Sequence, residues 1–456
     1  MKPIFRVLLA LVMLFSLPGC QAGPLSVPDG LRPENWLPEL LGQPSRTPSA
    51  SPAPTASESP SPPAGSQTVS APTETPPPVN VPGGLVLWVP PQFDPASGTP
   101  AGEILRARLA AFAIEYGVEV QVRVKAPSGP GGLLESLTTA AAAAPLALPG
   151  VVALSRTDLE TAAIKGLVTP LDGQSTIIDD GDWFDYARQL AMVQGATFGL
   201  PFAGDALVVA YRPGRTVGPP ATWDAAFRLG QPLAIPAGDP QALLVLSLYQ
   251  GLGGKIEDAQ GRPMLQPEVL SQVLQLLADG EQRGIFPYWL SQYETYAKVW
   301  QAFRDERVNA LVAWTSDFLQ NLPVDTTAVP LPGIGGAPQT LVTGWGWAVS
   351  DPLPERRALS VKLAEYLSEA GFLAKWSEAA GYLPTRPTSL AAWTNANLKT
   401  LLSTVALTAL ARPSNDLLMS QGVVLKEATL KVMKRESDPT QAAQAAAERL
   451  SVPQNR

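Results

Sequence analysis

Residues 85–89 read LVLWV, a short run of apolar side chains with no polar interruption. Such a run is typical of a strand that is buried on both faces of a sheet. Apolar residues at helical spacing follow and stop at Gly117, and residues 118–124 then alternate as VEVQVRV, the pattern of a strand with one polar face. A second helical segment leads to VVAL at residues 151–154. This order of strands and helices predicts a parallel or mixed sheet that is covered by helices.

The rest of the folded part continues the same alternation as far as residue 450. Strands are predicted at residues 206–211, 233–236, 309–314 and 341–350, and long amphipathic helices at residues 267–283 and 291–305. The last third of the chain reads as mainly helical. We therefore predict an α/β fold in two lobes, with mixed sheets flanked by helices.

The chain begins with a segment that resembles the leader of a bacterial lipoprotein. Residues 1–20 read MKPIFRVLLALVMLFSLPGC, in which Lys2 and Arg6 precede an apolar run that is shorter than the roughly 20 residues of a membrane-spanning helix. The last four residues resemble a lipobox, which makes Cys20 the predicted site of lipidation. The alternative is an ordinary secretory signal peptide followed by a chance cysteine.

The next segment is poor in apolar side chains. Residues 43–83 consist mostly of Pro, Ser, Thr and Ala, a composition that favours an extended, disordered tether. We assign residues 1–19 to a signal peptide, residues 20–83 to a lipid anchor and tether, and residues 451–456 to a tail. An exported protein anchored to the outer face of the cytoplasmic membrane is expected.

Composition excludes several classes of function. The 456 residues include 33 basic and 40 acidic side chains, one Cys and no His. Without His there is no Ser-His-Asp triad, no Cys-His dyad and no His-ligated zinc, and one Cys cannot close an intrachain disulfide. An acidic chain without a basic tract is a poor nucleic-acid binder. We predict no cofactor, no metal site, no nucleic-acid partner and a monomer.

Several motifs of the folded part occur in a familiar order. The chain resembles the extracellular solute-binding proteins of ABC importers, in the cluster that includes maltose and other sugar binders. The segments that carry the resemblance are LVLWVP at residues 85–90, GVVALSRTDLETAAIKGLVTPLD at 150–172, GATFGLPFAGDALVVAYRP at 195–213, PATWDAAF at 220–227, WQAFRDERVNALVAWTSDF at 300–318, VPLPGIGG at 329–336, GWGWAVSD at 344–351 and WSEAAGYLPTR at 376–386.

The resemblance implies two lobes joined at a hinge, with a ligand held in the cleft between them. Lobe 1 would comprise residues 84–201 and 332–371, and lobe 2 residues 202–331 and 372–450. Ligand contacts to both lobes would favour a closed form, which ABC permease subunits would then recognise.

A sugar site needs flat aromatic rings and hydrogen-bonding side chains, because sugars present C–H patches on their faces and hydroxyls at their edges. The resemblance places a stacking tryptophan at Trp314, and Trp345 and Trp347 alternate onto one face of a strand. Trp88 and Tyr382 are further candidates. For each of these aromatic residues, packing in the core is the competing interpretation.

The polar candidates follow predicted strands. The resemblance places an acidic cleft residue at Asp205, for which a turn or cap role is the alternative. Asp94 follows the first strand, and Ser155 and Arg156 follow the third. The carboxyl ends of strands in open α/β sheets face the ligand crevice, which favours these positions.

The leading hypothesis is a lipid-anchored protein that captures a mono- or oligosaccharide and delivers it to an ABC permease. A binding domain that feeds a surface sensor is the second hypothesis. An anchored glycoside hydrolase is the third, and it would need two carboxylates across the scissile bond, which no motif marks. A polyol, glycerol phosphate or thiamine remains open as the ligand.

Overall fold

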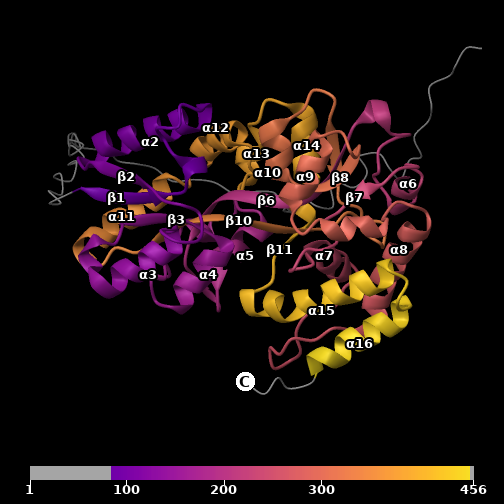
Figure 1. The fold of residues 1–456 in the computed structure, drawn as a ribbon. Coiled ribbons are helices and arrows are strands. Elements are labelled where there is room, and N and C mark those ends of the chain that lie inside the picture. The colour runs from indigo at the N-terminus through magenta and orange to yellow at the C-terminus, as the bar shows by residue number, and fades with distance from the viewer. Residues whose placement is uncertain (1–83, 452–456) are drawn as a thin grey trace, which may run out of the picture. The chain divides into compact units, whose positions relative to one another are not determined.

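The computed structural model describes residues 84–451, which contain a nine-stranded mixed sheet with helices on both sides (Figure 1). The main path of the sheet has the order β2-β1-β3-β10-β6-β8-β7, and β11 and β9 pair with β10 and β6. The predicted signal peptide, Cys20, the tether and most of the tail lie outside the described residues. In the described part of the chain, no helix is long and apolar enough to span a membrane.

The N-terminal half of the sheet is built from the pattern that opens the folded sequence. β1 (Leu85–Val89) lies between β2 (Val120–Val124) and β3 (Val151–Ser155) and is parallel to both. The connecting helices are α2 (Pro100–Tyr116) and α3 (Leu133–Ala143), and α4 (Arg156–Ile164) follows β3. Successive side chains of a strand point to opposite faces, so β1 and β3 contribute side chains to two apolar cores, one on each face of the sheet. The strand–helix prediction is confirmed here.

Two long strands run between the halves of the sheet. β6 (Leu200–Tyr211) is antiparallel to β10 (Thr340–Val349), which is antiparallel to β3 as well. The far half of β6 pairs with β8 (Ala310–Trp314) and β9 (Thr327–Pro330), and β7 (Leu233–Ala234) pairs with β8. Gly204 of β6 has no room for a Cβ atom, which would lie 2.6 Å from the Tyr186 hydroxyl. The same Cβ atom would lie 3.1 Å from the carbonyl oxygen of Leu383, whose backbone runs antiparallel beside Gly204 and exchanges two hydrogen bonds with it.

Helices complete the second half around the largest apolar core. They include α5 (Asp185–Ala191), α6 (Trp223–Phe227), α7 (Leu243–Gly251), α8 (Pro267–Gln282), α9 (Tyr296–Arg304) and α10 (Thr315–Asn321). The short strands β4 (Met192–Val193) and β5 (Ala196–Thr197) form a separate two-stranded sheet. Helix α9 begins later than the predicted residue 291. The 3₁₀ turn η7 (Tyr288–Gln292) precedes it, and the Thr295 hydroxyl accepts the Lys298 N–H as an N-cap.

The C-terminal third is mainly helical, as predicted. It contains α11 (Pro354–Tyr366), α12 (Ala370–Ala380), α13 (Pro387–Ala391), α14 (Ala396–Thr408), β11 (Ala409–Ala411), α15 (Asn415–Met433) and α16 (Pro439–Ser451). Helices α15 and α16 pack against α8 on the second half of the sheet (Figure 1).

Candidate functional site

Three of the predicted site residues lie in a diagonal row across neighbouring strands. Trp345 of β10 pairs with Ala203 of β6, and Trp314 of β8 pairs with Leu207 of β6. Asp205 lies between Ala203 and Leu207, and residues two apart on a strand share a face. Trp345, Asp205 and Trp314 therefore lie on one face of three adjacent strands, and all three are half-buried.

Ser155 extends this row onto the N-terminal half of the sheet. It is the partner of Trp345 on β3, so it shares the same face. Its hydroxyl accepts the Asp158 N–H at 3.2 Å and caps α4. We call Ser155, Trp345, Asp205 and Trp314 the candidate site; it joins the two halves of the sheet through the crossover strands.

The Asp205 carboxylate is held by the first turn of α10. One oxygen accepts the Thr315 hydroxyl and the Ser316 N–H, both at 2.9 Å, and the other accepts the Ser316 hydroxyl at 2.6 Å. Burial raises the pKa of Asp205 to about 7, although these hydrogen bonds oppose the rise. An ionised carboxylate offers about four acceptor positions, so one is left for a ligand hydroxyl.

The raised pKa of Asp205 predicts a pH-dependent stability. The folded protein keeps a proton on this carboxyl up to pH about 7, whereas the unfolded chain releases it near pH ~4. Between these two pH values the native state holds a proton that the unfolded chain has released. The contribution of Asp205 to stability is therefore fully present below pH ~4 and is lost as the pH rises to about 7. We expect the melting temperature of Asp205→Asn to fall less than that of wild type when the pH is raised from 5 to 8. Equal losses in the two proteins would show that the native carboxyl is already ionised.

Trp314 is positioned by a second aromatic residue. Its ring lies 5.2 Å from the Tyr296 ring, between centroids, with the planes inclined by 54°. Tyr296 is the first residue of α9 and was not among the predicted site residues. The local sequence feature that marks Tyr296 is Thr295, the N-cap residue directly before it. The pair fixes the orientation of the Trp314 indole beside the start of α10.

Trp345 is positioned by an aromatic cluster centred on Phe93. Phe93 follows β1 in the 3₁₀ turn η3 (Pro91–Phe93) and lies edge-on to Trp345, with centroids 5.2 Å apart. The Phe93 ring also contacts Phe202, Trp376 and Tyr382. Sequence reasoning missed Phe93, although its place at the carboxyl end of β1 was the signal that selected its neighbour Asp94.

Tyr382 connects this cluster to Asp205. It is buried against Phe93 and Trp376 and directly precedes Leu383, which bridges to Gly204 of β6. Burial, with a smaller effect of the Asp205 charge, raises the pKa of Tyr382 well above its usual value. The phenol therefore stays neutral at physiological pH and has little exposed surface for a ligand.

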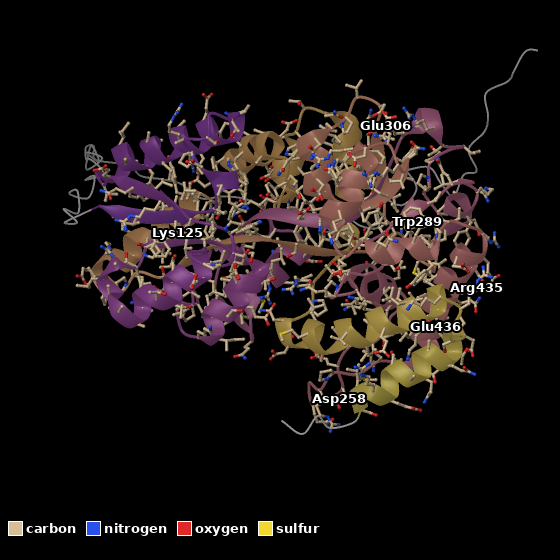
Figure 2. The ribbon with its side chains drawn as sticks, in the orientation of Figure 1. Lys125, Asp258, Trp289, Glu306, Arg435 and Glu436 are labelled. Carbon is tan, nitrogen blue, oxygen red and sulfur yellow. The ribbon has the colours of Figure 1, made fainter. Side chains whose placement is uncertain are left out.

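The other aromatic candidates lie deeper. Trp347 is 1% exposed and stacks on Phe202, with centroids 4.0 Å apart. Trp88 is 3% exposed, and its ring lies beneath the Lys125 ammonium at 4.5 Å. Trp88 lines a surface cavity of about 470 Å³ between β2 and α3, on the N-terminal half of the sheet where Figure 2 labels Lys125. Neither ring joins the row of the candidate site.

The remaining polar candidates have internal partners. The Asp94 carboxylate accepts the Ala96 N–H at 2.8 Å in the loop after η3. Arg156 is buried and pairs with Glu160 at 3.0 Å, while a second guanidinium nitrogen donates to the Met192 carbonyl. Glu160 also accepts the Asn415 N–H, which joins α4 to the start of α15. The guanidinium of Arg156 is thus engaged within the protein.

Comparison with known proteins places the chain in a family. A family model described as bacterial extracellular solute-binding protein matches residues 107–400, more than half of the chain. The chain belongs to the bacterial extracellular solute-binding proteins. This family consists of binding proteins rather than enzymes, and its description implies an exported protein.

Solved structures of solute-binding proteins share this fold. The sugar-binding protein MalE from Xanthomonas citri aligns with a TM-score of 0.65 and 19% identity, over 80% of this chain and 96% of that one. The cyclic alpha-maltosyl-1,6-maltose binding protein from Arthrobacter globiformis gives 0.65 and 17%, over 80% and 97%. A maltodextrin binding protein from L. casei gives 0.65 and 16%, over 82% and 100%. A comparison with curated proteins found no match. The predicted fold class is confirmed: a mixed α/β fold like that of the solute-binding protein MalE.

The side chains of the candidate site can bind a ligand through aromatic stacking and hydrogen bonds. Aromatic faces can cover the C–H patches of a sugar, and the carboxylate of Asp205 and the hydroxyl of Ser155 can form hydrogen bonds with its hydroxyl groups.

Within residues 84–451, no group of three or more His, Cys, Asp or Glu side chains could hold a metal ion. Asp180 and Asp182, which precede α5, pair with Arg386.

Proposed function

We propose that this solute-binding protein captures an oligosaccharide of the maltodextrin class at the candidate site and delivers it to an ABC permease. The observation that supports this most is the row of Trp345, Asp205 and Trp314 on one face of β10, β6 and β8. Two indole faces with a carboxylate between them match the alternating C–H and hydroxyl surfaces of a glucan. Two of the solved structures named above are described as binding maltodextrin or a cyclic maltosyl sugar, and the third as a sugar-binding protein.

The proposed mechanism is closure of two lobes on the sugar. Lobe 1 would comprise residues 84–201 and 332–371, and lobe 2 residues 202–331 and 372–450. Trp345 and Ser155 belong to the first set and Asp205 and Trp314 to the second, so a sugar that contacts all four stabilises the closed form by its differential affinity. Asp94 lies beside Phe93 at the same end of β1 and is a further proposed contact from lobe 1.

Lipidation of Cys20 is proposed as the anchor that keeps a monomeric protein beside its permease. Two or more acyl chains would hold it stably at the membrane, because one chain binds only marginally. Cys20→Ser should move the protein from the membrane fraction to the soluble fraction. Retention of the variant on membranes would exclude this anchor.

Calorimetric titration of the purified protein with maltose, maltotriose and maltotetraose tests the ligand class. We expect saturable binding of one sugar per chain and a higher melting temperature in its presence, since a ligand of the native state alone stabilises it. No binding of these sugars, together with a thermal shift by a polyol, glycerol phosphate or thiamine, would overturn the proposal.

A further inference from the structure

The 3₁₀ turn η7 presents aromatic side chains on the surface. Tyr288 is 41% exposed and Trp289 is 39% exposed, and among the described residues they are the aromatic members of the exposed large apolar side chains. Trp289 meets the ring of the half-buried Tyr293 edge-on, with centroids 6.0 Å apart and planes inclined by 79°. We call Tyr288, Trp289 and Tyr293 the η7 aromatic patch. Figure 2 labels Trp289 on the second half of the sheet.

Charged side chains border the η7 aromatic patch. The Lys434 ammonium lies 5.4 Å from the centre of the Tyr288 ring, at the end of α15. The next residue, Arg435, pairs with Glu281 of α8 at 2.7 Å. An apolar ring beside exposed hydrogen-bond donors and acceptors is suited to a pyranose, which needs both kinds of contact, more than to a purely apolar partner.

The η7 aromatic patch packs against the edge of the sheet at which Trp314 lies, because β7 is parallel to β8 and the loop after β7 therefore leaves the sheet at the same end as Trp314. The Tyr293 carbonyl accepts the Gly238 N–H at 2.9 Å. A Cβ atom at Gly238 would lie 2.6 Å from the Ser291 carbonyl, so the loop after β7 packs directly against η7. Three residues beyond Tyr293, Tyr296 contacts Trp314. One short segment thus carries the exposed rings and the aromatic residue that positions Trp314.

We propose that the η7 aromatic patch is a second carbohydrate-binding surface, which holds the distal sugars of a glucan whose other end occupies the candidate site. This inference rests on the proposed function and extends it to long chains. Stacking on Trp289 adds binding energy only for an oligosaccharide long enough to reach the patch. The contribution of Trp289 to affinity should therefore be absent for a short oligosaccharide and present for a long one.

Calorimetric titration of the full chain with maltotriose and maltoheptaose tests this dependence. Trp289→Ala should weaken maltoheptaose binding about fivefold and leave maltotriose binding unchanged, in line with the modest energy of one aromatic contact. Trp289→Phe retains a flat ring and should keep most of the affinity for maltoheptaose. Leu407→Ala, at an exposed apolar position on α14, is the matched control and should alter neither affinity.

The outcomes separate this inference from the proposed function. A loss confined to maltoheptaose supports the second surface. An equal effect of Trp289→Ala on both sugars, or no effect on either, overturns it while leaving the maltodextrin assignment intact. If wild-type protein binds neither sugar, the proposed function fails and the second surface fails with it. Melting temperatures of the variants confirm that the exposed substitutions leave the fold unchanged.

Discussion

Glu160→Gln should lower the free energy of unfolding by about 3 kcal/mol, because it leaves the Arg156 guanidinium buried without a counter-charge. Both side chains are nine-tenths buried or more, and burial already lowers the pKa of Arg156 below its usual value. Glu160 accepts hydrogen bonds both from Arg156 of α4 and from the backbone N–H of Asn415 at the start of α15. Urea denaturation followed by circular dichroism measures the loss.

Two further variants locate the origin of that loss. Glu160→Gln combined with Arg156→Met removes both charges and should recover most of the stability, since the cost lies in the unpaired buried charge. Glu294→Gln breaks the exposed pair of Glu294 with Lys298 and should leave stability nearly unchanged. A single Glu160→Gln variant as stable as wild type would show that Arg156 recruits water or another partner.

The strands could be predicted from the sequence because their signals are local. Apolar runs at residues 85–89, 151–154 and 310–314 each form a strand in the structure, and the alternation at residues 118–124 gives β2 with its polar positions exposed. The start of α9 could not be predicted, because residues 288–292 mix apolar and polar side chains in a pattern that suits either a helix or a short 3₁₀ turn. Only the Thr295 cap distinguishes them.

The sequence predicts which strands carry the residues of the candidate site, but not which other side chains those residues contact. Trp345 and Trp347 alternate identically in the sequence, yet Trp347 alone is stacked on Phe202, a contact between distant segments. The position of Asp205 after the glycine of β6 is a local feature. Its three hydrogen bonds come from Thr315 and Ser316, more than a hundred residues later in the chain. Such tertiary contacts decide which candidates keep surface for a ligand.

Trp314→Ala should weaken maltotriose binding about thirtyfold, or about 2 kcal/mol, the loss typical of removing a central aromatic contact. The indole is half-buried at the end of β8 and is oriented by Tyr296, so its remaining face is preorganised for a sugar ring. Calorimetric titration with maltotriose gives the affinity. Trp314→Phe retains a flat ring and should lose only a small part of it.

The stability of the variant must be measured beside its affinity, because Trp314 also packs against the largest core. Leu407→Ala is the control, since it shortens an apolar side chain at an exposed position outside both proposed sugar-binding surfaces and should leave maltotriose binding unchanged. If Trp314→Ala stays folded at the titration temperature and binds maltotriose as tightly as wild type, Trp314 is not a ligand contact. The row on β10, β6 and β8 would then reduce to Trp345 and Asp205, on β10 and β6, and β8 would contribute no aromatic contact to a bound sugar.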